Sequence, residues 1–285
     1  MLVQIVVSGL ASGATYALIA LGFVIIWNTA AVVNFAQGEF AVAAMFVALV
    51  LSRFGHVPLF LALPASVAAS ALLGWLTERI VIRPVIGRNA MTVVTVTIGL
   101  QIVLSDGAKL IFGGQPYPFP APFSGAPLGF GGVVLPRQSL LVILAMALLV
   151  AALHAMSVLT PFGKRLRAVA QDREVAAMMG IDVNRTVAQG FAVSAAVAGV
   201  AGVLLAPVIF VSADLGLPLL IKSFVAAIIG GFGSYPGALA GGLLIGVIDN
   251  VVSYAVSTDY RDVISFLVLI VMLLLRPTGL FPNHR

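Results

Sequence analysis

Long runs of apolar residues recur from the start of the chain almost to its end, and they constrain the fold more than any other feature. A helix needs about 20 predominantly apolar residues to cross a bilayer. Only 9% of the residues are charged and 61% are hydrophobic, whereas a soluble domain carries about 25% charged residues. Backbone in lipid must satisfy its own hydrogen bonds, which leaves helices or a closed barrel. The runs do not alternate apolar with polar residues as barrel strands do, so we predict an all-α, polytopic membrane bundle.

We expect about eight spans in a single membrane domain covering residues 1–285, with one or two helices short or broken. The expected spans are 4–27, 38–52, 59–82, 92–112, 139–159, 188–211, 219–231 with 236–256, and 262–276. The runs 38–52 and 219–231 are short, because 15 residues reach only about 22 Å against a hydrocarbon core of about 30 Å. They are tilted, broken or re-entrant. Non-helical backbone survives at such depth only inside protein or beside a watery cavity, so these runs are candidate pathway elements.

Basic residues cluster near three groups of predicted span ends, and short cytoplasmic loops are enriched in Lys and Arg. Ten of the 15 basic residues are Arg79, Arg83, Arg88, Lys164, Arg165, Arg167, Arg173, Arg185, Arg276 and Arg285. We therefore place these regions, including the C-terminus, in the cytoplasm. The 113–138 loop, whose only basic residue is Arg137, is expected outside. The side of Met1 stays open, because it depends on whether 38–52 spans or re-enters.

One segment, residues 160–184, carries charge inside this apolar chain. Thr160 followed by Pro161 fits an N-cap with proline at the first helical position. Gly180 fits the stop of that helix, and Asp182 fits the N-cap of the next one. We therefore predict a short helix between two spans, placed to contact a soluble protein.

Apolar and charged residues separate on this predicted helix. One face can hold Leu166, Val169, Ala170, Ala176 and Ala177. A face of small residues suits docking into a groove of a partner, and the alternative is a helix lying on lipid headgroups. Anionic lipid would repel Asp172 and Glu174, so we favour docking. The residues expected to couple the chain to the partner are Arg167, Ala170, Asp172, Glu174, Ala176, Ala177 and Gly180.

The sequence Glu-Val-Ala-Ala at 174–177, with Gly180, resembles the EAA-type coupling loop of ATP-binding-cassette (ABC) importer permeases, although one extra residue intervenes in its core. The surrounding GKRLRAVAQDREVAAMMGIDV is similar to the version in branched-chain amino-acid permeases of the LivH type. Further passages resemble the same family in the same order: GLASGATYALIALG (9–22), NFAQGE (34–39), GGFGSYPGALAGG (230–242) and RPTGLF (276–281). The resemblance therefore runs nearly end to end.

This resemblance implies the permease subunit of an ABC importer of the bacterial inner membrane, with leucine, isoleucine or valine as the expected cargo. It implies a second related permease, two cytoplasmic ATPase subunits and a periplasmic solute-binding protein as partners, besides membrane lipid. The chain itself would not be an enzyme and would need no cofactor. The alternative is a stand-alone channel or secondary transporter for a small solute such as urea or an amide, which would have no use for a docking helix.

Polar residues near the second run are candidates for a transport pathway. Glu39 is the only acid in the first seventy-seven residues, and Asn34 and Gln37 precede it. If 28–38 is a surface turn, Glu39 lies in the first turn of a helix, where the helix dipole favours an acid. If it lies at depth, an intramembrane carboxylate indicates a functional site. Both alternatives remain open.

Asp249 and Asn250 lie well inside the 236–256 run, and Asp249 has no obvious local cation. They either face the pathway or bond to a neighbouring helix. The sequence GGFGS at 230–234 interrupts the helical pattern, so Gly231 and Gly233 are also pathway candidates.

The glycines at 233, 237 and 241 are four residues apart. Small residues at that spacing allow helices to approach closely, so we expect them to share one packing face.

The sequence predicts no metal or nucleic-acid site. It has no cysteine, and its three histidines show no metal-ligand spacing. No Walker A motif is present. The basic residues flank spans instead of forming a patch for nucleic acid.

Overall fold

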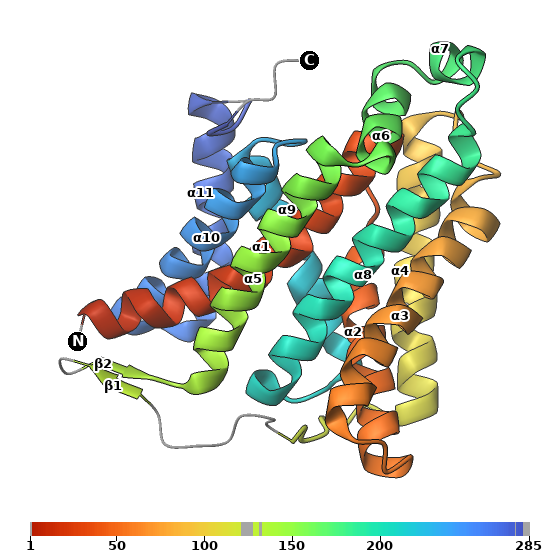
Figure 1. Cartoon of the computed structure of the whole chain (residues 1–285). Coiled ribbons are helices and arrows are strands. Elements are labelled where there is room, and N and C mark those ends of the chain that lie inside the picture. The colour runs from red at the N-terminus through yellow and green to blue at the C-terminus, as the bar shows by residue number, and fades with distance from the viewer. Residues whose placement is uncertain (1, 121–127, 131–132, 277, 282–285) are drawn as a thin grey trace.

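The computed structural model describes residues 2–120, 128–130, 133–276 and 278–281, and Figure 1 shows their helices packed side by side in one bundle. Eight helical segments in this part of the chain are long and apolar enough to cross a membrane. They are α1 (Leu2–Ala30), α2 (Gln37–Leu49, continued by a π turn, Val50–Phe54), α3 (Leu59–Thr77, continued by a π turn, Glu78–Ile82), α4 (Ala90–Phe112), α5 (Arg137–Leu159), α8 (Val183–Ile209), α9 (Gly216–Gly230, preceded by a 3-10 turn, Ala213–Leu215) and α10 (Tyr235–Ala255). The all-α polytopic bundle is confirmed. A two-stranded hairpin, β1 (Leu128–Phe130) and β2 (Val133–Leu135), lies in the connection from α4 to α5.

The predicted run 219–231 with 236–256 forms two helices, α9 and α10, that pack as a hairpin. The chain reverses at 231–234, where Gly231 and Gly233 have φ angles of 105° and 92°, a region that favours glycine. The Ser234 hydroxyl then accepts a hydrogen bond from the Gly237 N–H (3.1 Å) and caps α10. Gly233 thus precedes α10, so the expectation that it shares one helix face with Gly237 and Gly241 was wrong. The last predicted span is α11 (Arg261–Leu275), preceded by a 3-10 turn (Thr258–Tyr260) and only 15 residues long.

Helix α1 is the most buried of the eight spans and runs through the centre of the bundle. Helix α10 crosses it through glycines: Gly242 lies against Ala17, and Gly246 lies against Gly13. A Cβ atom on Gly13 would stand only 2.7 Å from the Gly242 carbonyl oxygen. The close packing predicted for the glycines at 237 and 241 is confirmed on the other side of α10, where they lie against Gly230 and Ala226 of α9, because small residues bring the backbones together.

Helix α2 begins inside the bundle and not at its end. After Ala30 the chain turns back as non-helical backbone through 31–36. Gln37 then packs on Gly22, which lies about 12 Å before the end of α1. From there α2 continues to the opposite end, where α3 begins (Figure 1). The run 38–52 therefore continues to the opposite end of the bundle, which favours crossing over re-entry, and its irregular start is buried in protein, as non-helical backbone at this depth must be.

The basic regions predicted to share one side lie at one end of the bundle. Arg83, just after α3, pairs with Glu78 (2.9 Å) and donates to the Asn184 carbonyl at the start of α8 (3.5 Å). The hydrogen bond to Glu78 raises the pKa of Arg83 above its ordinary value. The 160–184 segment and residues 278–281 lie at this same end, and the start of α1 and the strands β1 and β2 lie at the other (Figure 1). Arg285 falls outside the described residues.

Candidate functional site

Residues 160–184 form two short helices, α6 (Pro161–Gln171) and α7 (Arg173–Met178), and not the single helix that was predicted. Asp172 is extended between them. Its carboxylate accepts hydrogen bonds from the backbone N–H groups of Glu174 (2.8 Å) and Val175 (3.0 Å). The prediction was wrong because a short acidic side chain that accepts from the N–H groups two and three residues ahead favours the start of a new helix over continuation of the old one.

The predicted ends of the segment are confirmed. The Thr160 hydroxyl accepts a hydrogen bond from the Gly163 N–H (3.1 Å) and caps α6. Gly180, with φ of 79°, follows α7 in the left-handed region. The Asp182 carboxylate accepts from the Arg185 N–H (2.9 Å) and caps α8.

The apolar face predicted to dock on a partner packs into the protein instead. Leu166, Val169 and Ala176 are buried. Val169 and Ala176 share a buried cluster with Ile26 of α1 and Phe191 of α8. The assignment of Ala176 to an exposed docking face is therefore corrected, because its own bundle covers that face. Ala170 is half-buried.

The large exposed apolar side chains of the segment lie on α7 and directly after it. Val175, Met178 and Met179 expose 53%, 85% and 78% of their surface, and Ala177 is also exposed. These four residues are called the α7 tip below. Methionines adapt their shape to a partner surface, and grouped exposed apolar side chains commonly mark an interaction site. Glu174 and Gly180, both exposed, flank the tip.

Two arginines tie this segment to the bundle. Arg173 donates a hydrogen bond to the carbonyl of Ala30, the last residue of α1, and Arg167 donates to the carbonyl of Ser157 in α5. Burial lowers the pKa of Arg173 from its ordinary value, but a guanidinium stays protonated at neutral pH. Helix α7, which carries the tip, is thus connected to the central helix through Arg173.

Asn34, Gln37 and Glu39 are all buried, so the alternative of a surface turn at 28–38 is wrong. The Asn34 side-chain oxygen accepts from the Ala36 N–H (3.0 Å) and shapes the irregular backbone. Gln37 donates to the Ser194 carbonyl (3.3 Å), and the Ser194 hydroxyl donates back to the Gln37 side-chain oxygen (3.1 Å). These bonds hold the start of α2 against α8.

The Glu39 carboxylate lies where two helices begin. It belongs to the first turn of α2 and packs on Gly216, the first residue of α9. Each helix N-terminus carries a partial positive charge that stabilises an acid. Gln101 of α4 donates a hydrogen bond to Glu39 Oε1 (3.1 Å). Glu39 also lines a cavity of about 410 Å³ between α2 and α4, so it lies both in the first turn of a helix and at the wall of a cavity.

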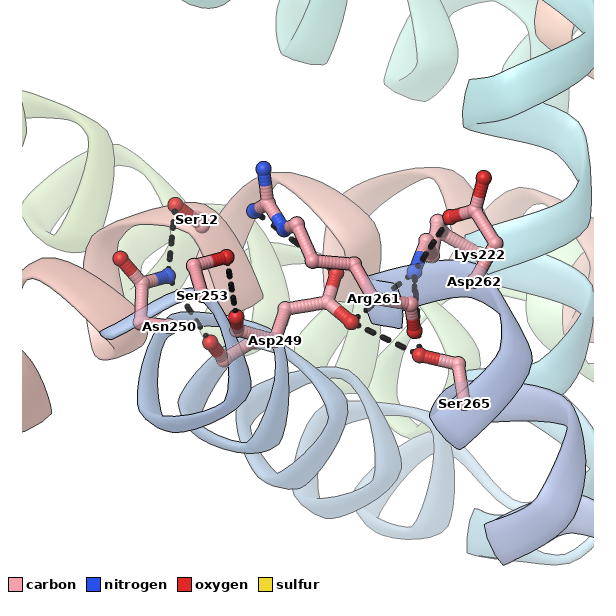
Figure 2. A network of polar contacts seen from close by, with 9 residues as sticks. Ser12, Lys222, Asp249, Asn250, Ser253, Arg261, Asp262 and Ser265 are labelled. Atoms are coloured by element: carbon pink, nitrogen blue, oxygen red, sulfur yellow. Dashed lines mark hydrogen bonds and ion pairs between the residues drawn. The ribbon is translucent and has the colours of Figure 1, made fainter. Parts of the chain in front are cut away.

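Asp249 has a cation partner that the sequence analysis missed. Lys222 Nζ of α9 lies 2.9 Å from Asp249 Oδ1, and the Ser265 hydroxyl of α11 donates to the same oxygen (2.7 Å; Figure 2). Lys222 Nζ also lies 2.9 Å from Asp262. The cluster therefore joins α9, α10 and α11 through one buried ammonium.

The other pathway candidates of the C-terminal half also form hydrogen bonds or packing contacts with other parts of this chain. Asn250 donates to the Ser12 hydroxyl (3.4 Å) and to the Gly246 carbonyl (3.0 Å; Figure 2). Gly231 packs on Gly279 of the C-terminal tail. The Gly233 carbonyl accepts from Asn28 of α1 (2.8 Å).

The model of one protein family, the branched-chain amino acid transport system / permease component, matches residues 5–273. The chain belongs to this family. It is 32% identical to the high-affinity branched-chain amino acid transport system permease protein LivH of Salmonella typhimurium, over 96% of this chain and 93% of that one. It is 33% identical to the corresponding protein BraD of Pseudomonas aeruginosa, over 97% and 94%. LivH of Escherichia coli K12 is 31% identical over 96% and 93%.

Family membership makes the chain a transport permease component and not an enzyme. The eight apolar helical segments and these relatives together make it a multi-pass membrane protein.

Several partners of the candidate site residues were missed from the sequence, among them Gln101, Ser194 and Lys222. Lys222 had a usable signal, because it is the one charged residue between Asp214 and Asp249, and a lone cation within a span requires a partner. Gln101 and Ser194 had none, because an uncharged polar residue in a span does not by itself indicate what it contacts.

Proposed function

We propose that this chain is the membrane-spanning permease subunit of an ATP-driven ABC importer in the bacterial inner membrane, and that its cargo is leucine, isoleucine or valine. The α7 tip carries this proposal. It presents exposed apolar side chains at the basic end of the bundle, where a water-soluble protein can reach them. A stand-alone channel or secondary transporter has no use for such a surface. The cargo class follows from the relatives, which are permease proteins of branched-chain amino acid transport systems.

The partners follow from this role. One of two cytoplasmic ATPase subunits binds the α7 tip, a second related permease completes the membrane unit, and a periplasmic solute-binding protein delivers cargo at the other end. The end with α6, α7 and the C-terminus then faces the cytoplasm, and the N-terminus faces outward. ATPase states that bind the tip differently shift the permease between conformations, which is how ATP hydrolysis supplies the work.

Within the coupling segment, 160–184, we assign two kinds of role. The flanking residues Glu174 and Gly180 and the tip residue Ala177 face the ATPase. Arg167, Ala170, Asp172 and Ala176 hold the segment in place, since Asp172 caps α7 and Ala176 is buried.

The transport pathway runs beside α2, α4 and α9, with Asn34, Gln37 and Glu39 shaping and lining it. We assign Asp249, Asn250, Gly231 and Gly233 to helix packing, because each is bonded to or packed against another element of this chain.

Reconstitution tests the function. Proteoliposomes containing this permease, its co-encoded second permease and both ATPases, supplied with the binding protein outside and ATP inside, should accumulate radiolabelled leucine. Omission of the ATPases should stop uptake. Leucine uptake that proceeds without the ATPases would contradict the proposal and favour the channel or secondary transporter. Competition by unlabelled isoleucine, valine and urea then identifies the cargo.

A further inference from the structure

Two cavities lie one after the other beside α4. The first, about 410 Å³, lies between α2 and α4 and reaches from Glu39 to Leu51 and Phe112 near the outward end proposed above. The second, about 230 Å³, lies between the 31–36 backbone, α4 and α9, and is lined by Phe35, Ile98 and Phe224. Along α4, residues 103–112 line the first cavity and residues 98–101 line the second. The two cavities therefore succeed one another along the membrane normal.

A single polar contact lies between them. Glu39 lines the first cavity, Gln101 lines the second, and their side chains are joined by the hydrogen bond of 3.1 Å. The other side chains that line the two cavities are apolar or glycine. A polar pair at the boundary of two apolar cavities is the one place where a polar group of a passing solute can form a directed bond.

The carboxylate has no cation partner among the residues that the structure describes. Its charge is stabilised by the N-termini of α2 and α9 and by the Gln101 amide. A buried carboxylate with only a neutral hydrogen-bond partner binds a cation more strongly than it binds an amide, because the attraction between opposite charges adds to the hydrogen bond and is strong where the dielectric is low. An alkylammonium group is thus the solute group that competes best with Gln101.

Glu39 and Gln101 lie on helices that differ in burial. Glu39 is on α2, which is well buried, whereas α4 is among the least buried of the spans. Val103 and Ile111 of α4 expose 67% and 76% of their surface. Gln101 can therefore move away with α4 while Glu39 stays in place.

We propose that Glu39 and Gln101 form the gate of the pathway, and that cargo passes when its ammonium group replaces Gln101 on the Glu39 carboxylate. The apolar linings on either side receive the aliphatic side chain. The inference rests on the proposed function for the identity of the cargo, but the closure of the gate can be tested without it.

Cysteine labelling tests the closure. The chain has no cysteine, so Ala108→Cys in the first cavity and Ile221→Cys in the second provide single thiols. In membrane vesicles of known orientation, a small impermeant thiol reagent added from the outward side should label position 108 and not 221. Adding Gln101→Ala should make position 221 reactive. Gln138→Ala is the matched control, because Gln138 bonds to the Leu204 carbonyl (2.7 Å), away from both cavities.

The closure is overturned by any of three results: position 108 does not react, which makes the first cavity a lipid-facing groove; position 221 reacts in the parent; or Gln101→Ala leaves position 221 unreactive. None of these results depends on the ATPases or on the cargo.

Transport tests the ammonium recognition. In the complete reconstituted importer, Glu39→Gln should lower leucine uptake about tenfold to a hundredfold, the range for a lost hydrogen bond to a charged group. ATP hydrolysis should continue, and 4-methylpentanoate, which lacks the ammonium, should not compete.

If the parent imports no amino acid, the proposed function fails. If the parent imports leucine and Glu39→Gln imports it equally, the recognition fails. Should Glu39→Gln not assemble, Gln101→Glu decides instead, because a second carboxylate must change leucine uptake if the pair meets the ammonium.

Discussion

Arg173 of α7 donates a hydrogen bond to the carbonyl oxygen of Ala30, the last residue of α1. The final carbonyls of a helix have no partner within it, and a cation there also interacts favourably with the helix dipole. Helix α1 is crossed in turn by α10 through glycines. Together with the packing of Ala176 in the cluster that contains Ile26 of α1, this bond ties α7 to the central helix.

Arg173→Ala should uncouple the transporter without unfolding it. The variant should retain its ATPases and their hydrolysis but import leucine about tenfold more slowly, since a hydrogen bond from a charged donor is worth at least ~1.4 kcal/mol. The measurement is the ratio of leucine imported to ATP hydrolysed. Arg173→Lys, which keeps the charge, should recover part of the loss. An unchanged ratio in Arg173→Ala would show that the bond transmits nothing.

Lys222→Met should destabilise the permease strongly. It leaves the Asp249 carboxylate buried without its ammonium, and breaking a buried pair costs about 3–5 kcal/mol. The measurement is thermal or denaturant unfolding in detergent. The double variant Lys222→Met with Asp249→Leu should recover most of this loss, and Lys109→Met, whose partners Asp106 and Asp214 are exposed, should cost far less. A double variant as unstable as the single one would mean that the pair is not the source of the effect.

Gly246→Leu should destabilise the crossing of α1 and α10, because a Cβ there would run into the backbone of Gly13. Overpacking costs about 1–3 kcal/mol. Gly99→Leu on α4 is the control, since no atom lies within 4 Å of a Cβ placed at that position. The loss of detergent stability should be confined to Gly246→Leu, and equal losses at both sites would remove the packing explanation.

Cysteines at Pro120 and Met179 should react from opposite sides of the membrane. Both positions are exposed, Pro120 in the connection that follows α4 and Met179 directly after α7. That connection and α7 lie at opposite ends of the bundle (Figure 1). An impermeant thiol reagent outside intact cells should label Pro120→Cys only, and should label Met179→Cys only after the cells are opened. Labelling of Met179→Cys in intact cells would reverse the proposed orientation.

Features carried by local sequence could be predicted well. The apolar runs identified the spans because the bilayer selects for length and composition, and the caps at Thr160 and Asp182 were correct because a cap needs only residues within one turn. The grouping of the basic residues at one end followed from their positions relative to the spans.

Features set by tertiary contacts could not be predicted. The partner of Asp249 is Lys222, 27 residues away on another helix, and no local pattern pairs them. The start of α2 inside the bundle depends on Gln37 meeting Gly22 and Ser194. The predicted docking face was wrong because periodicity shows that a helix has an apolar face, but not whether the bundle or a partner covers it.

The most direct test of the proposed coupling is the amount of ATPase that co-purifies with Met178→Glu. Met178 is the most exposed of the three large apolar side chains of the α7 tip, so a charge there should be buried on docking and left unpaired, at a cost of several kcal/mol. The ATPase-to-permease ratio after affinity purification should fall to background for Met178→Glu. It should stay at the parent level for Gln171→Glu, which adds the same charge at an exposed position of the same segment outside the tip. A Met178→Glu protein that retains the ATPases in the parent ratio would contradict the assignment of the α7 tip as the docking site.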